Sequence, residues 1–205
     1  DGGDYADRVE LQNIKGRFPY PDLSGEYRMG GEWGYFEAAG ILRYIKWDDV
    51  LEDQFDLSGS DVGWGINLSS NVKLGKNVLR LQGVYGEGIE NYMNDAPADL
   101  GPRNNFSSPT RPIEGELLPV LGLVAFFDVN WSDKMSSTIG YSSVDIDNSS
   151  GQSDDAFSKG EYALANILFY PVPNLMFGPE IQWGHRDNFR DGFSSDDLRF
   201  QFTVK

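Results

Sequence analysis

Hydrophobic and polar residues alternate with period two along most of this chain. The segments that alternate, each with one apolar face, are residues 23–29, 36–44, 62–68, 79–85, 117–131, 135–141, 163–169, 175–183 and 198–204. Glycine, serine, asparagine and aspartate separate these segments, and helical periodicity is scarce. Period-two alternation bounded by turn residues is typical of half-exposed β-strands. The pattern therefore predicts an all-β protein with nine strands.

The apolar faces contain no Asp, Glu, Lys or Arg, although 24% of the chain is charged. Polar side chains gather on the opposite faces, which carry Glu26, Arg28, Glu37, Arg43, Asn67, Arg80, Gln82, Glu180, Gln182, Arg186, Arg199, Gln201, Thr203 and Lys205. A sheet that meets lipid on one side and water on the other is expected to divide its residues in this way.

The links between the predicted strands alternate in length. They are short after the first, third, fifth and seventh strands and long after the others, at about 48–60, 86–115, 147–160 and 187–196. Short turns at one end and long loops at the other are typical of outer-membrane barrels. The longest strongly apolar run, Leu117–Phe127, is shorter than the roughly 20 residues of a membrane helix. The sequence thus disfavours a helical membrane protein and predicts an antiparallel transmembrane β-barrel.

Aromatic residues lie near the ends of the apolar faces. At the short-turn end these are Trp33, Trp131 and Phe169, and at the long-loop end they are Trp47, Tyr85, Tyr141 and Trp183. Two aromatic belts are expected where a barrel wall meets lipid headgroups. Aromatics that cover the rims of a β-sandwich are the alternative.

The segment 117–131 departs from the alternation, because its second face is apolar as well. That face carries Leu118, Val120, Gly122, Val124 and Phe126. A strand that is apolar on both sides needs cover on both. We therefore expect a segment folded into the barrel to pack there, and the adjacent loop 86–115 is the nearest candidate.

Composition narrows the classes of function. The net charge of −15 disfavours nucleic-acid binding, and the absence of cysteine excludes disulfides and thiolate sites. A single histidine does not supply a His-rich metal centre, and we expect neither a metal nor a cofactor. That histidine, His185, lies on the apolar register of its strand and is interpreted as a polar residue at the membrane interface rather than a catalytic base.

Acidic residues concentrate in the predicted loops. Asp145, Asp147, Asp154 and Asp155 flank residues 148–151, a faint likeness to a calcium loop that lacks its glycine spacing. We interpret this segment as a solvated hairpin tip. The acidic loop 48–56 is interpreted in the same way, although acidic outer loops can also bind divalent cations among lipopolysaccharide.

The polar faces carry six basic side chains, Arg28, Arg43, Arg80, Arg186, Arg199 and Lys205, against three acidic ones, Glu26, Glu37 and Glu180. Rings of basic residues favour anions in pores, and guanidinium groups bind carboxylates in a forked geometry. The predicted channel-lining residues are Arg28, Arg43, Arg80, Gln82, Glu180, Gln182, Arg186, Arg199 and Gln201, with Arg103 and Arg111 as constriction candidates if the loop 86–115 folds inward. The alternative is that the arginines pair with acids across the wall and only line water.

Two parts of the sequence resemble the DcaP family of outer-membrane porins. One is residues 23–49 with Gly63-Trp64-Gly65-Ile66-Asn67, and the other comprises residues 169–174, 178–184 and 198–202. The resemblance implies a homotrimeric porin with roughly sixteen strands per subunit, a periplasmic coiled coil, and uptake of small anions such as dicarboxylates.

On this resemblance, residues 1–205 would be the C-terminal portion of a single barrel domain. Sixteen strands with the same average number of residues per strand as these nine need roughly 365 residues. An open edge at the first strand would not be viable in lipid. We therefore expect residues 1–22 to continue from a preceding strand, and a terminal aromatic to follow Lys205.

The sequence favours a non-enzymatic porin of the bacterial outer membrane. It would contact lipid and lipopolysaccharide, pass small anionic solutes, and bind no nucleic acid. The alternatives are an outer-membrane barrel enzyme or adhesin, and a secreted carbohydrate-binding β-sandwich.

Overall fold

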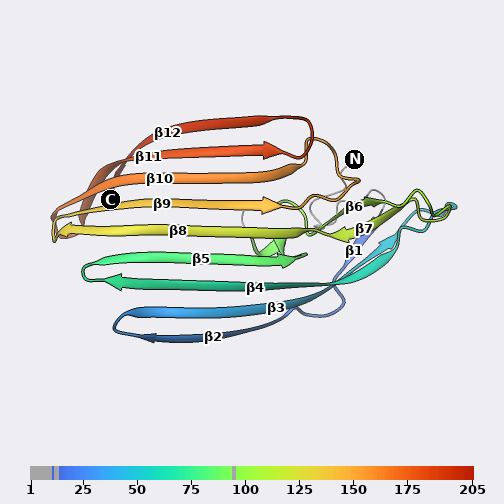
Figure 1. Cartoon of the computed structure of the whole chain (residues 1–205), viewed down its shortest axis with the longest axis horizontal. Helices are drawn as coiled ribbons and strands as arrows, with labels where there is room; N and C mark the ends of the chain where they lie inside the picture. Colours follow the sequence, from blue (N-terminus) through green and yellow to red (C-terminus); the bar gives the residue numbers. More distant parts are fainter. Residues whose placement is uncertain (1–10, 12–13, 94–95) are drawn as a thin grey trace.

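The alternating segments pair into one antiparallel sheet in this computed structural model, which describes residue 11 and residues 14–93 and 96–205. The strands of this sheet are β1 (Ile14–Arg17), β2 (Leu23–Gly31), β3 (Gly34–Asp49), β4 (Gly59–Leu74), β5 (Asn77–Glu87), β8 (Pro119–Ser132), β9 (Met135–Ile146), β10 (Phe157–Val172), β11 (Leu175–Asn188) and β12 (Ser194–Val204). All nine predicted strands are present, and from β2 to β12 they lie in chain order (Figure 1).

The alternation of short and long links is confirmed (Figure 1). Two-residue turns join β2 to β3, β4 to β5, β8 to β9 and β10 to β11, whereas the long links cover residues 50–58, 88–118, 147–156 and 189–193. The last link is shorter than the predicted 187–196, because the pairing of β11 with β12 continues as far as Asp187 and Ser194. No helix in the described part of the chain is long and apolar enough to cross a membrane.

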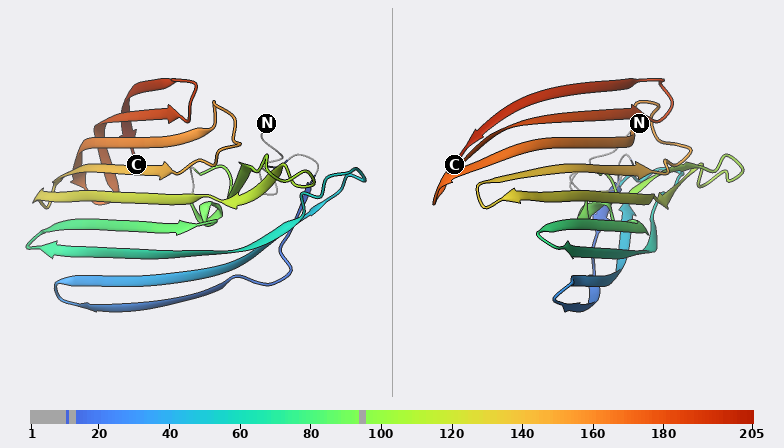
Figure 2. Two further views of the ribbon diagram at one scale, coloured as in Figure 1. Left: turned by 45° about the vertical axis from the view of Figure 1, so that its right-hand side comes forward. Right: turned by 60° about the vertical axis from the view of Figure 1, so that its left-hand side comes forward.

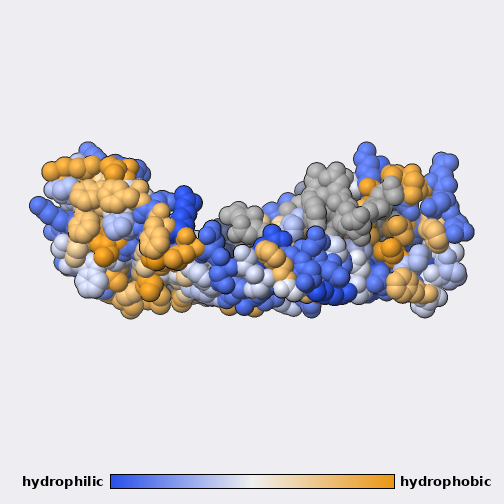
Figure 3. Space-filling model, turned by 90° about the horizontal axis from the view of Figure 1, so that it is seen from above, coloured by the Kyte–Doolittle hydropathy of each residue, from blue (hydrophilic) through white to orange (hydrophobic). Residues whose placement is uncertain are grey.

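The pairing register keeps the apolar faces on one side of the sheet. Ile139 of β9 lies opposite Phe127 of β8 and Ala165 of β10, and Ala165 lies opposite Ile181 of β11. Large apolar side chains on this outer face stay exposed, including Ile139 at 62% and Phe200 at 75%. The sheet curves away from this face (Figure 2). In the space-filling view hydrophobic residues lie at both ends, most densely on the left, and hydrophilic residues lie over the hollowed middle (Figure 3).

One edge strand of the sheet is interrupted. Both β1 and β2 run antiparallel to β3, β1 against its end at Lys46–Asp49 and β2 against residues 34–42. The residues between them include Pro19 and Pro21, which have no N–H to donate to a ladder. The expected continuation into a preceding strand falls in part on residues 1–10 and 12–13, which lie outside the described residues.

The link between β5 and β8 contains structure that the sequence analysis did not predict. It holds a 3-10 helix, η2 (Glu90–Tyr92), and a hairpin of β6 (Leu100–Asn104) with β7 (Ile113–Leu117). The predicted strand 117–131 was wrong at its start, because Leu117 ends β7. The Leu118 N–H continues the pairing of this hairpin by donating to the Asp99 carbonyl at 3.2 Å, and the pairing with β5 begins at Pro119, opposite Glu87.

Trp47 was wrongly assigned to an aromatic belt. It is 4% exposed and packs with Leu11, Ile45, Leu100 and Leu117 in a small core between β3 and the β6–β7 hairpin. Its indole Nε1 donates to the Leu57 carbonyl at 2.7 Å. Trp47 therefore holds the hairpin over the long-link end of the sheet rather than facing outward.

Candidate channel wall and constriction

The inner, concave face of the sheet contains a cavity of about 1290 Å³. Its wall includes Asn67 of β4, Gln82 of β5, Tyr162 of β10 and Arg186 of β11, and Tyr92 of η2 also lines it. One space bounded by strands from β3 to β12 requires that the sheet curve around it. This cavity is the candidate passage for a solute.

The segment 88–118 folds onto the inner face, as the apolar second face of 117–131 predicted. Ile89, Leu118, Val120 and Ile146 share a buried cluster, and Met93 packs against it. Gly122 makes room for the contact, because a Cβ there would lie 2.7 Å from Met93 Cε and Met93 would have to shift. The inward fold of this segment is thus built by apolar packing on β8.

Two predicted wall arginines form ion pairs on the inner face. Arg28 lies 3.6 Å from Glu37, and Arg80 lies 2.7 Å from Asp128. The sequence analysis missed Asp128, although its register, one residue from the outward Phe127, marks it as inward. Because Asp128 adds a negative charge to the inner face, the excess of basic over acidic side chains on the wall is smaller than predicted.

Arg43 is buried rather than exposed to the cavity, with 4% of its surface accessible. Its guanidinium lies 3.0 Å from Asp22 and 3.1 Å from Asp99, and Nη1 donates to the Gly88 carbonyl at 2.6 Å. Asp99 had no signal in the sequence, because its approach to Arg43 depends on how the link folds.

The amide and glutamate side chains of the wall bond to one another. Gln82 donates to Asn67 at 3.1 Å, and Gln201 donates to Thr203 at 3.2 Å. Glu180 accepts from Asn166 at 3.0 Å and also from Gln182, which the sequence analysis placed on the same face. These bonds form a polar inner surface that water can wet.

Arg186 and Arg199 are the predicted wall arginines without a carboxylate at ion-pair distance among the described residues. Arg186 Nε donates to Asn188 at 3.0 Å, and its guanidinium lies 5.6 Å from the Phe157 ring centroid. Arg199 lies on β12 opposite Gln182. Of the predicted wall arginines, these two keep a positive charge that no described carboxylate balances at ion-pair distance.

Arg103 and Arg111 are engaged in the long links. Arg103 spans the β6–β7 hairpin to Glu114 at 2.6 Å and Glu116 at 3.4 Å, and Arg111 reaches Asp56 in the β3–β4 link at 3.2 Å. The hydrogen bond from Arg103 lowers the pKa of Glu114 below its ordinary value. The residues of this link that line the cavity are instead Ile89, Tyr92 and Met93.

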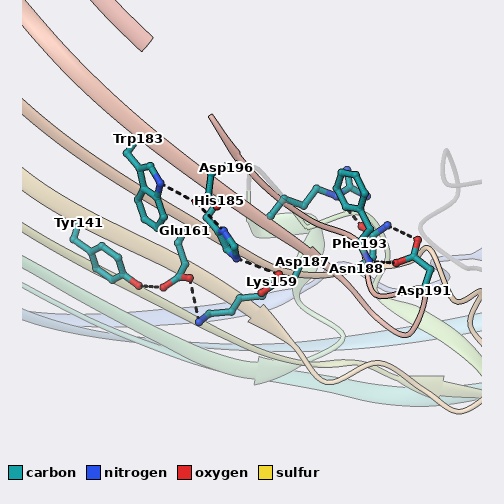
Figure 4. Close-up of polar contacts among 11 residues, drawn as sticks. Tyr141, Lys159, Glu161, Trp183, His185, Asp187, Asn188, Asp191, Phe193 and Asp196 are labelled. Atoms are coloured by element: carbon teal, nitrogen blue, oxygen red, sulfur yellow. Dashed lines mark hydrogen bonds and ion pairs between the residues drawn. The ribbon is translucent and has the colours of Figure 1, made fainter. Parts of the chain in front are cut away.

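Polar residues cluster on the outer face at its long-link end (Figure 4). His185 Nδ1 lies 3.1 Å from Asp196, and its Nε2 lies 3.1 Å from Asp187. Nearby, Tyr141 donates to Glu161, which pairs with Lys159 at 3.3 Å. Because carboxylates occupy both ring nitrogens of His185, neither is available to activate a serine.

The acidic links bond internally in the structure. The Asp49 carboxylate accepts from the Leu57 N–H at 2.9 Å, and Asn148 donates to Gln152 at 3.1 Å within the β9–β10 link. Among the residues that the structure describes, no group of three or more His, Cys, Asp or Glu side chains has the arrangement of a metal site.

Comparison with known proteins gives a match in structure alone. No protein-family model matches the chain, and no curated protein matches its sequence. The fold matches the crystal structure of the outer membrane channel DcaP of Acinetobacter baumannii, with a TM-score of 0.75, 18% sequence identity and 96% of this chain covered. The chain spans 54% of the length of that channel. The predicted fold, an antiparallel porin-type barrel wall, is therefore confirmed.

Proposed function

We propose that the protein forms a passive diffusion channel in a bacterial outer membrane. The observation that carries this proposal is the division of one curved sheet into an exposed apolar outer face and a polar inner face around the cavity. A soluble sheet buries its apolar face, whereas a barrel wall presents it to lipid. Solutes move down their gradient through water in the lumen, with no chemical step and no cofactor.

The sheet is open in this structure, with β1 and β2 along one edge and β12 at the other. In a bilayer both edges need hydrogen-bonding partners, because an unpaired strand edge cannot face lipid. The structurally similar channel is about twice as long as this chain, which supports a wall of which these strands form part.

The resemblance noted in the sequence supports a homotrimer, and native mass spectrometry in detergent tests that assembly.

Small anions, including dicarboxylates, are the proposed solutes. Arg186 and Arg199 support this choice, because their guanidinium groups lie on the inner face without a direct carboxylate partner among the described residues. Such groups lower the electrostatic barrier for anions. The acidic side chains that give the chain its net charge of −15 lie largely in links and ion pairs, so the net charge does not oppose this selectivity.

Conductance in planar bilayers tests the channel. The protein is expected to insert from detergent and give discrete, ohmic current steps. A sealed barrel without conductance, or a protein that stays monodisperse without detergent, contradicts the proposal.

Reversal potentials in a salt gradient test the solute class. Arg186→Gln with Arg199→Gln is expected to lower the permeability of succinate relative to a matched cation by several-fold. Arg199→Lys is the control, since it keeps the charge and is expected to retain the preference. A wild-type channel that favours the cation contradicts the anion proposal without contradicting the channel.

A further inference from the structure

The part of the β5–β8 link that lines the cavity is short and lies at the start of that link. We call residues 88–93 the inner turn. Ile89 lies over the strands that bear Gly65 and Gly86, where a Cβ would come within 2.6 and 2.7 Å of its Cδ1. These contacts hold the Ile89 side chain, and the Gly88 N–H donates to the Leu118 carbonyl at 3.1 Å.

Arg43 provides a side-chain contact to the backbone of the inner turn. The carbonyl of Gly88, where the turn begins, accepts from Arg43 Nη1 at 2.6 Å. The same nitrogen pairs with Asp99, whose Oδ1 accepts from the Asn91 N–H at 2.6 Å. One guanidinium therefore contacts the start of the turn directly and its middle through Asp99.

Arg43 also joins the turn to the edge of the sheet. Its Nε donates to Asp22 at 3.0 Å, and Asp22 directly precedes β2. Tyr92 of the inner turn donates to the same carboxylate oxygen at 2.5 Å, and its ring centroid lies 5.3 Å from the guanidinium. Edge strand, wall and inner turn thus meet at a single cation.

The positive charge of Arg43 keeps the carboxylates of Asp22 and Asp99 together at this site. The Arg43 side chain is 3% exposed and that of Asp99 is 1% exposed, so water screens their charges poorly. A neutral side chain at position 43 would leave two carboxylates close together in a buried site. Because like charges then repel, Asp99 and the inner turn would move away from the wall.

We propose that Arg43 is the positioning residue that holds the inner turn against the wall and thereby sets the width of the passage. This inference rests on the proposed channel function for its effect on solutes, but not for the docking of the turn. Arg43 has no contact with a passing solute in this role, because it is covered by the turn that it holds.

A thiol placed on the buried side of the link reports docking directly. Ala98 belongs to the link and is fully buried in the cluster that the link forms with Val120 and Ile146, and the chain has no cysteine of its own. We expect Ala98→Cys to react slowly with a small thiol reagent, and Arg43→Gln to speed the reaction roughly a hundredfold, since an uncompensated buried charge favours local opening. Adding Asp99→Asn to Arg43→Gln is expected to restore slow labelling in part, because it removes the repulsion.

Two further variants keep this test interpretable. Arg17→Gln is the matched control, because it removes an exposed arginine that pairs with Asp48, at 3.0 Å, rather than with a residue of the inner turn, and labelling is expected to stay slow. Arg43→Lys keeps the charge but offers a single nitrogen in place of three, and an intermediate rate is expected. Unchanged labelling in both Arg43→Gln and Arg43→Lys overturns the proposal.

Single-channel conductance then measures the passage. Arg43→Gln is expected to raise the conductance about twofold or more by the widened bore. Faster labelling with unchanged conductance overturns the assigned role in setting the width. Should the wild-type protein not conduct at all, the proposed function fails, while labelling still decides whether Arg43 holds the turn.

Discussion

A charge placed on the outer face should destabilise the protein far more than the same charge on the inner face. Leu81 and Gln82 are neighbours on β5, and both are exposed. Leu81 is 42% exposed on the apolar face, opposite Ala125, whereas Gln82 lines the cavity. The proposed perturbations are Leu81→Lys and Gln82→Lys, with Leu81→Ala as the control for lost side-chain volume.

The position of Leu81 sets the expected magnitude. It lies four residues beyond the start of β5, which at about 3.3 Å per residue is roughly 13 Å along the strand. If the strand is tilted by about 40° from the membrane normal, this length along the strand places Leu81 close to the middle of an apolar band about 25 Å tall. A lysine there costs about 2–4 kcal/mol. Gln82→Lys removes one hydrogen bond to Asn67, worth about 1 kcal/mol.

Reversible unfolding by denaturant in phospholipid vesicles measures these free energies. Leu81→Lys is expected to lose at least about 1 kcal/mol more than Gln82→Lys, and Leu81→Ala is expected to lose less than Leu81→Lys. An equal or smaller loss for Leu81→Lys would refute the assignment of this face to lipid.

Three further predictions concern the inner segment and the links. Gly122→Val is expected to displace Met93 and cost about 1–3 kcal/mol by overpacking, measured as earlier proteolysis of the link. Trp47→Ala is expected to cost about 3–5 kcal/mol by emptying its core, measured by thermal unfolding, with Trp47→Phe milder. Because the pKa of Glu114 is lowered in the folded protein, its pairing with Arg103 stabilises the hairpin fully above the ordinary carboxyl pKa of 4.5. This stabilisation is lost as the pH falls through the lower pKa of the folded state. Amide exchange of the hairpin across about pH 2–6 is expected to show increasing exposure toward low pH.

Which residues share a face was decided by the sequence alone. Side chains alternate across a strand whatever lies beside it, so the outward register of Ile139 and the inward register of Arg80 follow from position. The same periodicity predicted the nine strands β2–β5 and β8–β12 but not β1, β6 or β7. The two apolar faces of 117–131 predicted the inward fold of the link. The fold of the wall was therefore available without tertiary information, because each of these features depends on local sequence.

The partners of the inward residues were decided only by the tertiary structure. The alternation places three arginines on polar strand faces without distinguishing them: Arg43, Arg186 and Arg199. In the structure Arg43 is buried, whereas the other two lack a direct carboxylate partner among the described residues. The difference arises because the link carries Asp99 back across the wall to Arg43 and not to the others. Ion pairing depends on distances between segments far apart in the chain, which periodicity within a strand does not specify, and those distances decide which charges the inner face presents.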